Sequence, residues 1–111
     1  MRRLFSPVRS DNKLYYTIEG DKITVVHHQT LPPTLDDNMY PVEQDPIVTQ
    51  DVFDFTGMPN GVATVSEFET VLPLNPFISV KRVNGEIEIK VINYIGANAT
   101  EAERFPVWEV L

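Results

Sequence analysis

The sequence predicts a mainly β protein: an antiparallel sheet built on two β-hairpins, arranged as a sandwich or a partly open barrel. Three observations support this class. Two segments alternate apolar and polar side chains around a two-residue turn. Prolines exclude long helices from the middle of the chain, and the helix-start signals leave room for only one or two short helical turns. The 111 residues are expected to form a single β-rich domain over residues 1–111.

The first hairpin is predicted over residues 14–28, with Gly20-Asp21 as its turn. A two-residue turn pairs Glu19 with Lys22, so that opposite charges lie side by side. One face of this hairpin then carries Leu14, Tyr16, Ile18, Ile23, Val25 and His27. The opposite face is amphipathic and carries Tyr15, Thr17, Thr24, Val26 and His28. Apolar residues on both faces favour a sandwich or a partly closed barrel.

The second hairpin is predicted over residues 77–92, around Asn84-Gly85. Asn-Gly is the preferred type I′ turn, because both of its positions need a positive φ. The resulting register pairs Lys81 with Glu88 on the polar face. On the apolar face this register pairs Val80 with Ile89 and Ile78 with Val91. Arg82 also falls on that face, next to the turn, where its stem is expected to extend outward.

The middle of the chain, residues 31–76, is proline-rich and acidic. It holds eight acidic residues, no Lys or Arg, and seven of the nine prolines, which predicts extended segments broken by turns. Residues 51–55 are expected to pair with residues 61–65 across a turn at residues 58–61. The apolar residues expected to give this zone material to bury are Val42, Ile47, Val48, Val52, Phe53, Phe55, Val65, Phe68 and Leu72.

Two sequence patterns predict short helical turns. Ser66-Glu67-Phe68-Glu69 and Thr100-Glu101-Ala102-Glu103 both match the capping box, in which a Ser or Thr and a Glu three residues later satisfy each other's backbone donors. The first turn must end before Pro73 and the second before Pro106, because proline cannot continue a helix.

Composition excludes several classes of function. The formal net charge of -7 argues against nucleic acid and against an anionic membrane surface, which both attract basic patches. The absence of cysteine excludes thiolate nucleophiles and Cys-based zinc sites. No signal-peptide pattern and no long apolar stretch is present, so the chain is expected to be soluble and cytoplasmic. No serine nucleophile motif or cofactor motif appears, which predicts a protein that is not an enzyme and that holds no cofactor.

The candidate ligand residues are two adjacent histidines and a group of acids. His27 and His28 point to opposite faces of a strand and cannot chelate one metal together, so His27 is expected to be a packed, hydrogen-bonded core residue. The acidic group offers oxygen ligands for a hard cation but lacks the spacing of an EF-hand. We expect these residues to lie in a solvated loop. They are Asp36, Asp37, Asn38, Glu43 and Asp45.

The C-terminal tail is apolar to its last residue, whereas solvated tails are usually small and polar. It is therefore expected to dock, either on its own sheet as a terminal strand or on a neighbour's sheet edge. The residues predicted to bind a partner are Phe105, Val107, Trp108, Val110 and Leu111 in the tail, with Asp36, Asp37, Glu43 and Asp45 in the acidic zone.

The function predicted from these features is a non-enzymatic structural or protein-interaction module that binds a protein partner or self-associates. The composition, which is short, acidic, cysteine-free and β-rich, resembles that of small accessory proteins of phages and prophages, and this resemblance implies association with a virion. Two alternatives stay open. One is a small-molecule or cation-binding domain that uses His27, Tyr16 and the acids between Asp36 and Asp45. The other is an acidic inhibitor that imitates nucleic acid.

Overall fold

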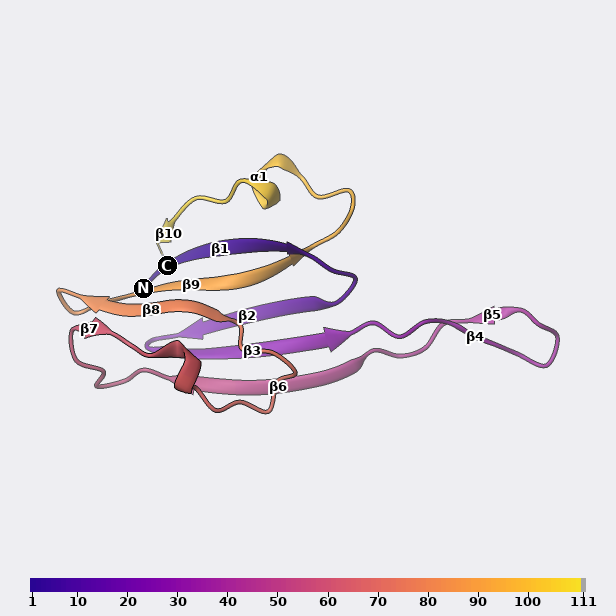
Figure 1. Ribbon diagram of the computed structural model, residues 1–111, viewed down its shortest axis with the longest axis horizontal. Coiled ribbons are helices and arrows are strands. Elements are labelled where there is room, and N and C mark those ends of the chain that lie inside the picture. Colours follow the sequence, from indigo (N-terminus) through magenta and orange to yellow (C-terminus); the bar gives the residue numbers. More distant parts are fainter. Residues whose placement is uncertain (111) are drawn as a thin grey trace.

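The computed structural model describes residues 1–110, of which 51% lie in strands and 6% in helical turns. The mainly β class predicted from the sequence is therefore confirmed (Figure 1). The elements in chain order are β1 (Arg2–Arg9), β2 (Lys13–Glu19), β3 (Lys22–Gln29), β4 (Thr34–Leu35), β5 (Pro41–Val42), β6 (Ile47–Asp54), β7 (Gly61–Val62), the 3-10 turn η1 (Val65–Glu67), β8 (Phe77–Val83), β9 (Glu86–Ile95), α1 (Glu101–Arg104) and β10 (Glu109–Val110).

The strands form two main sheets that share one core. One sheet has the order β10-β1-β9-β8-β7 and the other the order β2-β3-β6, and neither closes on itself within residues 1–110. A short separate ladder joins β4 to β5. Side chains from both main sheets contribute to a single buried cluster, as expected for a sandwich or an open barrel. The cluster consists of Leu14, Ile23, Val25, Phe53, Phe55, Leu72, Phe77, Val80, Ile87, Ile89 and Val91.

The first hairpin forms in the predicted register. Glu19 lies opposite Lys22, and the pairing continues without a break to Lys13 opposite His28. Gly20 in the turn has a φ of 61°, which glycine adopts without strain. The inner face is buried as predicted, with Ile23 and Val25 both fully inaccessible to solvent.

The second hairpin matches its prediction near the turn and departs from it near the start of β8. Lys81 pairs with Glu88 and Val80 with Ile89 as expected. A bulge then shifts the register, so that Phe77 rather than Ile78 lies opposite Val91. Phe77 is 4% exposed and Ile78 is 42% exposed. The predicted pairing of Ile78 is therefore wrong.

The bulge has a clear packing reason. It moves the Phe77 ring into the core, where its centroid lies 4.7 Å from that of Phe53 and 5.6 Å from that of Phe55, both in edge-on geometry. Such aromatic pairs add attraction beyond the area that they bury. Asn75 fixes the entry to β8, since its Oδ1 accepts from Phe77 N and its Nδ2 donates to Val65 O. A bulge commonly redirects a side chain in this way.

Arg82 connects the two hairpins instead of extending into solvent. Its guanidinium donates to Gly85 O in its own turn, to Asp21 Oδ2 in the turn of the first hairpin, and to Phe55 O. The side chain is 14% exposed. The expectation of an outward-pointing stem is wrong, because three acceptors converge on this position only in the folded protein.

The predicted pairing of residues 51–55 with residues 61–65 does not form. Instead β6 pairs antiparallel with β3 over eight residues, and β7 pairs with β8. The turn lies earlier than predicted, at residues 55–58, where Met58 N donates to Phe55 O and Gly57 has a φ of 77°. The open edge of β3 offers a far longer ladder than a local hairpin of five residues, so the long-range pairing prevails.

One of the two predicted capping boxes forms. At Thr100 the side chain accepts from Glu103 N while the Glu103 carboxylate accepts from Thr100 N, and α1 follows. The other predicted box, at Ser66, does not form. A short helical turn is present here, the 3-10 turn η1, but its N-cap is Thr64, two residues before Ser66, and it has no side-chain cap.

The N-terminal strand β1 makes a pairing that local sequence patterns did not predict. It runs parallel to β9 over eight residues and carries β10 on its other edge. Pro7 is tolerated here because β10 pairs only with Arg2 and Arg3, so that Pro7 lies where β1 is an edge strand. Arg2 adds an ion pair to Glu88 at 2.8 Å.

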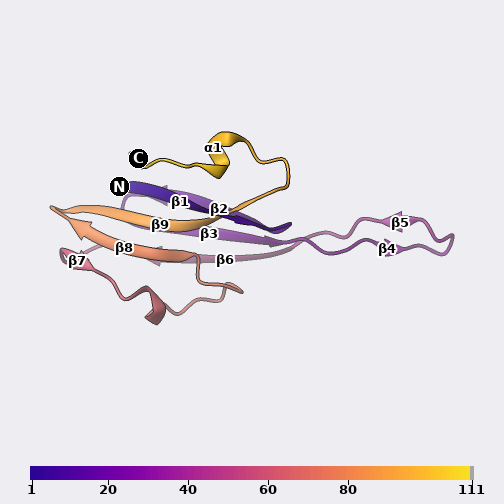
Figure 2. The same cartoon turned by 45° about the horizontal axis from the view of Figure 1, so that its top comes forward.

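A hairpin arm projects from the compact part of the molecule (Figures 1 and 2). We define the arm as residues 31–46, which include β4 and β5 and connect β3 to β6. The Cα radius of gyration is 16.7 Å, whereas a compact domain of this length has about 13 Å. The longest dimension, 61 Å, is about twice the next, 31 Å. The arm therefore accounts for the elongated shape.

Replacement of Gly85 by valine tests the turn of the second hairpin. Gly85 has a φ of 82°, and a β-branched residue there is strained even though no atom lies within 4 Å of an added Cβ. We expect Gly85→Val to lower the free energy of unfolding by about 1–3 kcal/mol, measured by urea denaturation. Gly96→Val is the matched control, because Gly96 also has open space and lacks a positive φ. Equal stability of the two variants would contradict the turn assignment.

Candidate functional site

The C-terminal tail docks on its own sheet. Glu109 and Val110 form β10 against Arg3 and Arg2 of β1, and the Arg3 guanidinium lies 2.6 Å from the Glu109 carboxylate. The guanidinium carbon of Arg2 lies 5.3 Å from the ring centroid of Trp108, within the range of a cation-π contact. The predicted terminal strand is therefore present.

The tail leaves most of its apolar side chains uncovered. Phe105, Val107 and Val110 are each more than 70% exposed, and Trp108 is 40% exposed. Leu111, which was also predicted to bind a partner, lies outside the described residues. The tail is therefore held to the domain by charge and backbone pairing, while its predicted contact with a partner stays a prediction.

The predicted acidic residues all lie on the arm. Asp36 organises the tip: its Oδ1 accepts from the backbone N of Asn38 and of Tyr40, while Met39 N donates to Asp36 O. Met39 completes this turn with a φ of 64°. Asp37 lies in the same turn, and Glu43 and Asp45 follow along the second limb, all exposed. The tip therefore has a defined conformation that local hydrogen bonds hold.

The arm also exposes large apolar side chains. Every residue from 32 to 46 is exposed. Leu35, Met39 and Tyr40 are 58%, 71% and 68% exposed, and Val42 is 43% exposed. Val42 was expected to be buried and is not, and the sequence pattern did not mark the other three as exposed. Their positions on both sides of a turn could have indicated a hairpin. No pattern in the neighbouring sequence, however, shows that this hairpin extends away from the domain.

The residues of the alternative ligand site do not come together. His27 is 2% exposed and lies in the core, where its ring centroid is 6.2 Å from that of Tyr94. Tyr16 is partly buried and its hydroxyl donates to Ile92 O. The acids between Asp36 and Asp45 lie on the arm, which extends away from this core (Figure 1). A joint site of these groups would need a different conformation.

His27 is buried as predicted, but its hydrogen bonding differs from the prediction. Nδ1 is shielded from solvent and has no hydrogen-bond partner in the protein. Burial, with a smaller contribution from the nearby charge of His28, lowers the pKa of His27. Near neutral pH the folded protein therefore favours the neutral form of this imidazole.

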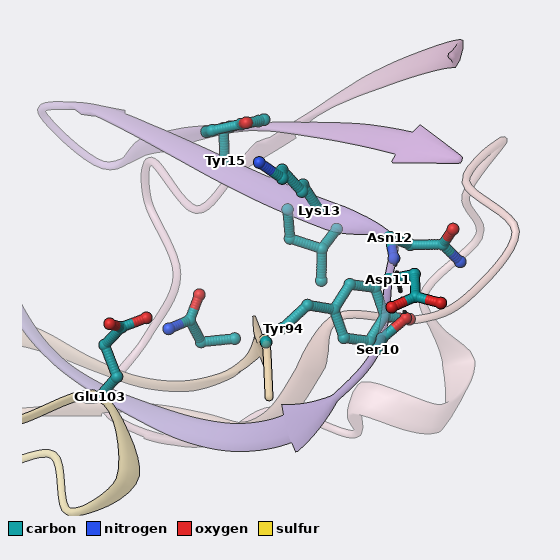
Figure 3. A pocket seen from close by; sticks show the side chains of 10 residues that line it. Ser10, Asp11, Asn12, Lys13, Tyr15, Tyr94 and Glu103 are labelled. Carbon is teal, nitrogen blue, oxygen red and sulfur yellow. Dashed lines mark hydrogen bonds between the residues drawn. The ribbon is translucent and has the colours of Figure 1, made fainter. Parts of the chain in front are cut away.

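An open pocket of about 590 Å³ lies where the β1–β2 loop meets the end of β9 (Figure 3). Tyr94 forms its apolar side and Asp11, Lys13 and Glu103 are on its rim. Part of its polar surface already serves the fold, because Ser10 Oγ accepts from Asn12 N. The three buried unpartnered polar atoms among the described residues, in Arg3, His27 and Arg82, belong to none of its lining residues. The pocket therefore shows no preformed ligand site.

Within residues 1–110 no three His, Cys, Asp or Glu residues cluster as a metal site would require. No helix among these residues is both long enough and apolar enough to span a bilayer. Comparisons with protein-family models, with curated proteins and with solved structures found no significant match to this chain. The geometry of the chain itself is therefore the basis for any functional proposal.

The buried neutral His27 predicts a pH dependence of stability. In the unfolded chain this histidine has its ordinary pKa near 6.5, and in the folded protein the pKa is lower. The contribution of neutral His27 to the free energy of unfolding is therefore fully present above pH 6.5. It is lost as the pH falls from 6.5 toward the pKa of the folded state, because over this interval only the unfolded state gains the proton. We expect the thermal midpoint to decrease between pH 7 and pH 5.

The variant His27→Leu should show a flatter profile over the same interval. Asp51 and Asp54 do not interfere, because their pKa values are lowered below 3.8 and their contributions are lost only in stronger acid. A wild-type decrease that is unchanged in the variant would assign the pH dependence to another group.

Proposed function

We propose that this protein is a non-enzymatic structural or interaction module that contacts a protein partner through its arm. The observation that carries the proposal is the combination of exposure and order in residues 31–46. Residues 32–46 are all exposed, yet they include large apolar side chains and a hydrogen-bonded tip. Exposed apolar surface of this kind commonly marks an interaction site.

We expect the arm to contribute little to the stability of the domain, for the following physical reasons. Its ladder contains only two residue pairs, Thr34 with Val42 and Leu35 with Pro41. A two-stranded hairpin is marginally stable in water without a third strand or an apolar surface to pack on. Its exposed side chains would gain free energy on burial against a partner, and the ordered tip reduces the entropy lost on binding.

The charge of the arm limits the kind of surface that it fits. Residues 31–46 contain Asp36, Asp37, Glu43 and Asp45 and no basic residue. A complementary partner surface therefore combines an apolar strip with positive charge. A small acidic accessory protein of a larger assembly, the type that the composition resembles, would use such a contact.

The two alternatives from the sequence have less support. A cation site would need the arm acids to converge. Asp36 already accepts two backbone hydrogen bonds in the tip, where Asp37 also lies, whereas Glu43 and Asp45 lie further along the second limb. A nucleic-acid mimic would present carboxylates without neighbouring apolar groups, whereas on this arm the exposed Met39 and Tyr40 lie in the same tip as Asp36 and Asp37. The apolar content favours a protein partner.

Replacement of the arm tests the proposal. A variant in which a short Gly-Ser turn joins residue 30 to residue 47 should keep its thermal midpoint within about 4 °C, which corresponds to less than 1 kcal/mol. It should lose every association that the wild-type protein makes, measured by light scattering of the purified protein and by crosslinking in the cells that produce it. Complexes that persist without the arm, or a variant that does not fold, would contradict the proposed function.

A further inference from the structure

We infer that the partner of the arm is a second copy of this chain. The arm of each copy lies across the outer face of the β2-β3-β6 sheet of the other, in a two-fold symmetric dimer. This inference rests on the proposed function and identifies its partner. It is argued from the exposed face of that sheet, from the direction and length of the arm, and from the charges on both.

The outer face of the three-stranded sheet is apolar and uncovered. The pairings place Val26 between Tyr15 and Gln50, and Thr24 between Thr17 and Val52. The large apolar residues of this face are Tyr15, Val48 and Val52, which are 48%, 55% and 51% exposed, with Val26 partly exposed among them. The face matches the arm in chemistry, because both combine exposed aliphatic groups with a tyrosine.

The arm cannot reach this face in its own chain without a sharp bend. Its two limbs continue β3 and β6 beyond the end of the sheet and extend away from it (Figures 1 and 2). The prolines at positions 32, 33, 41 and 46 also limit its ability to add to a sheet edge through backbone hydrogen bonds. The arm is therefore suited to pack through its side chains on the sheet of a neighbour.

The arm and the sheet are of similar length (Figure 1). Outside the tip turn at residues 36–40, the two limbs contain five and six residues, which span about 16–20 Å at the rise of an extended strand, and the turn adds to this reach. β3 and β6 contain eight residues each. In the dimer, the outer faces of the two copies meet near the bases of their arms, and a two-fold axis relates the copies. Each arm then covers most of the length of the other copy's sheet. The interface is then isologous and closed.

Charges at the base of the arm complement one another in this arrangement. Lys13 and His28 pair across β2 and β3 at the arm end of the outer face. Within the described part of the chain Lys13 has no ion pair. The acids of the second limb, Glu43 and Asp45, lie near the same end, so in the dimer their negative charge would lie close to Lys13 of the other copy. A groove of about 230 Å³ is present here, lined by Lys13, Tyr15, His28, Thr30, Gln44 and Pro46.

The contact is large enough for a specific dimer. About half of the sixteen arm residues face the sheet, and the three strands present twelve residues on the outer face. Together these make about 20 residues on each copy, at the lower end of the 20–30 residues per side of a standard interface. The formal charge of -7 on each chain opposes association at long range, so the apolar contacts must supply the attraction.

The first experiment measures the mass in solution. We expect light scattering to give about 25 kDa, twice the 12.6 kDa of one chain, as the protein concentration is raised from about 1 μM to about 1 mM. Val48→Glu, which places a negative charge on the outer face, should produce a folded monomer. Val62→Glu is the matched control, since Val62 is a 78% exposed valine on β7 of the other sheet, and this variant should stay dimeric.

The second experiment determines the geometry and benefits from the absence of native cysteine. Chains carrying Met39→Cys at the arm tip are mixed with chains carrying Val52→Cys at the far end of the outer face. Oxidation should yield disulfide-linked heterodimers in high proportion. The mixture of Met39→Cys with Val62→Cys is the control for random collision, because both residues are more than 70% exposed, and it should yield few.

The outcomes separate this inference from the proposed function. A wild-type monomer at all concentrations overturns the self-association and directs the arm to a different protein. A dimer that requires the arm but survives Val48→Glu and gives no Met39–Val52 crosslink overturns the arm-on-sheet geometry alone. A dimer that persists after replacement of the arm overturns both this inference and the proposed function.

Discussion

The mutual burial of the two hairpins is the interaction on which the rest of the structure depends. Ile23 and Val25 of β3 and Ile87, Ile89 and Val91 of β9 are at most 1% exposed. Each such side chain contributes about 1.5–3 kcal/mol when it is fully buried. The turns that precede β3 and β9 fix which side chains face inward, because a slip of one residue would turn every one of them to solvent.

The remaining elements attach to this pair of hairpins at edges that the hairpins leave open. β6 adds to β3, and β1 adds to β9, both over eight residues. Arg82 then connects the turn regions through Asp21, Gly85 and Phe55. The arm emerges where β3 leads into β6, so its direction follows from the sheet. The same geometry that completes the sheet therefore projects an apolar, acidic hairpin beyond it, which is the feature that both proposals use.

Local patterns predicted the parts of the fold in which neighbours in sequence are neighbours in space. The alternation of side chains and the short turns were sufficient for the register of the first hairpin and for the turn of the second. The capping box at Thr100 needed only residues within one helical turn. The candidate site was predicted in part, since the acidic residues Asp36, Asp37, Glu43 and Asp45 were identified, but the apolar residues beside them were assigned to the core or passed over.

By itself, the sequence determined the β class, the two hairpins and the acidic, proline-broken character of residues 31–76, because alternation, turn chemistry and proline act within a few residues. Only the tertiary structure decided that β6 joins β3, that Phe77 replaces Ile78 in the core, and that residues 31–46 leave the domain. Each of these depends on a surface formed by distant residues: the open edge of β3, the cavity beside Phe53 and Phe55, and the end of a sheet beyond which no further strand offers a partner.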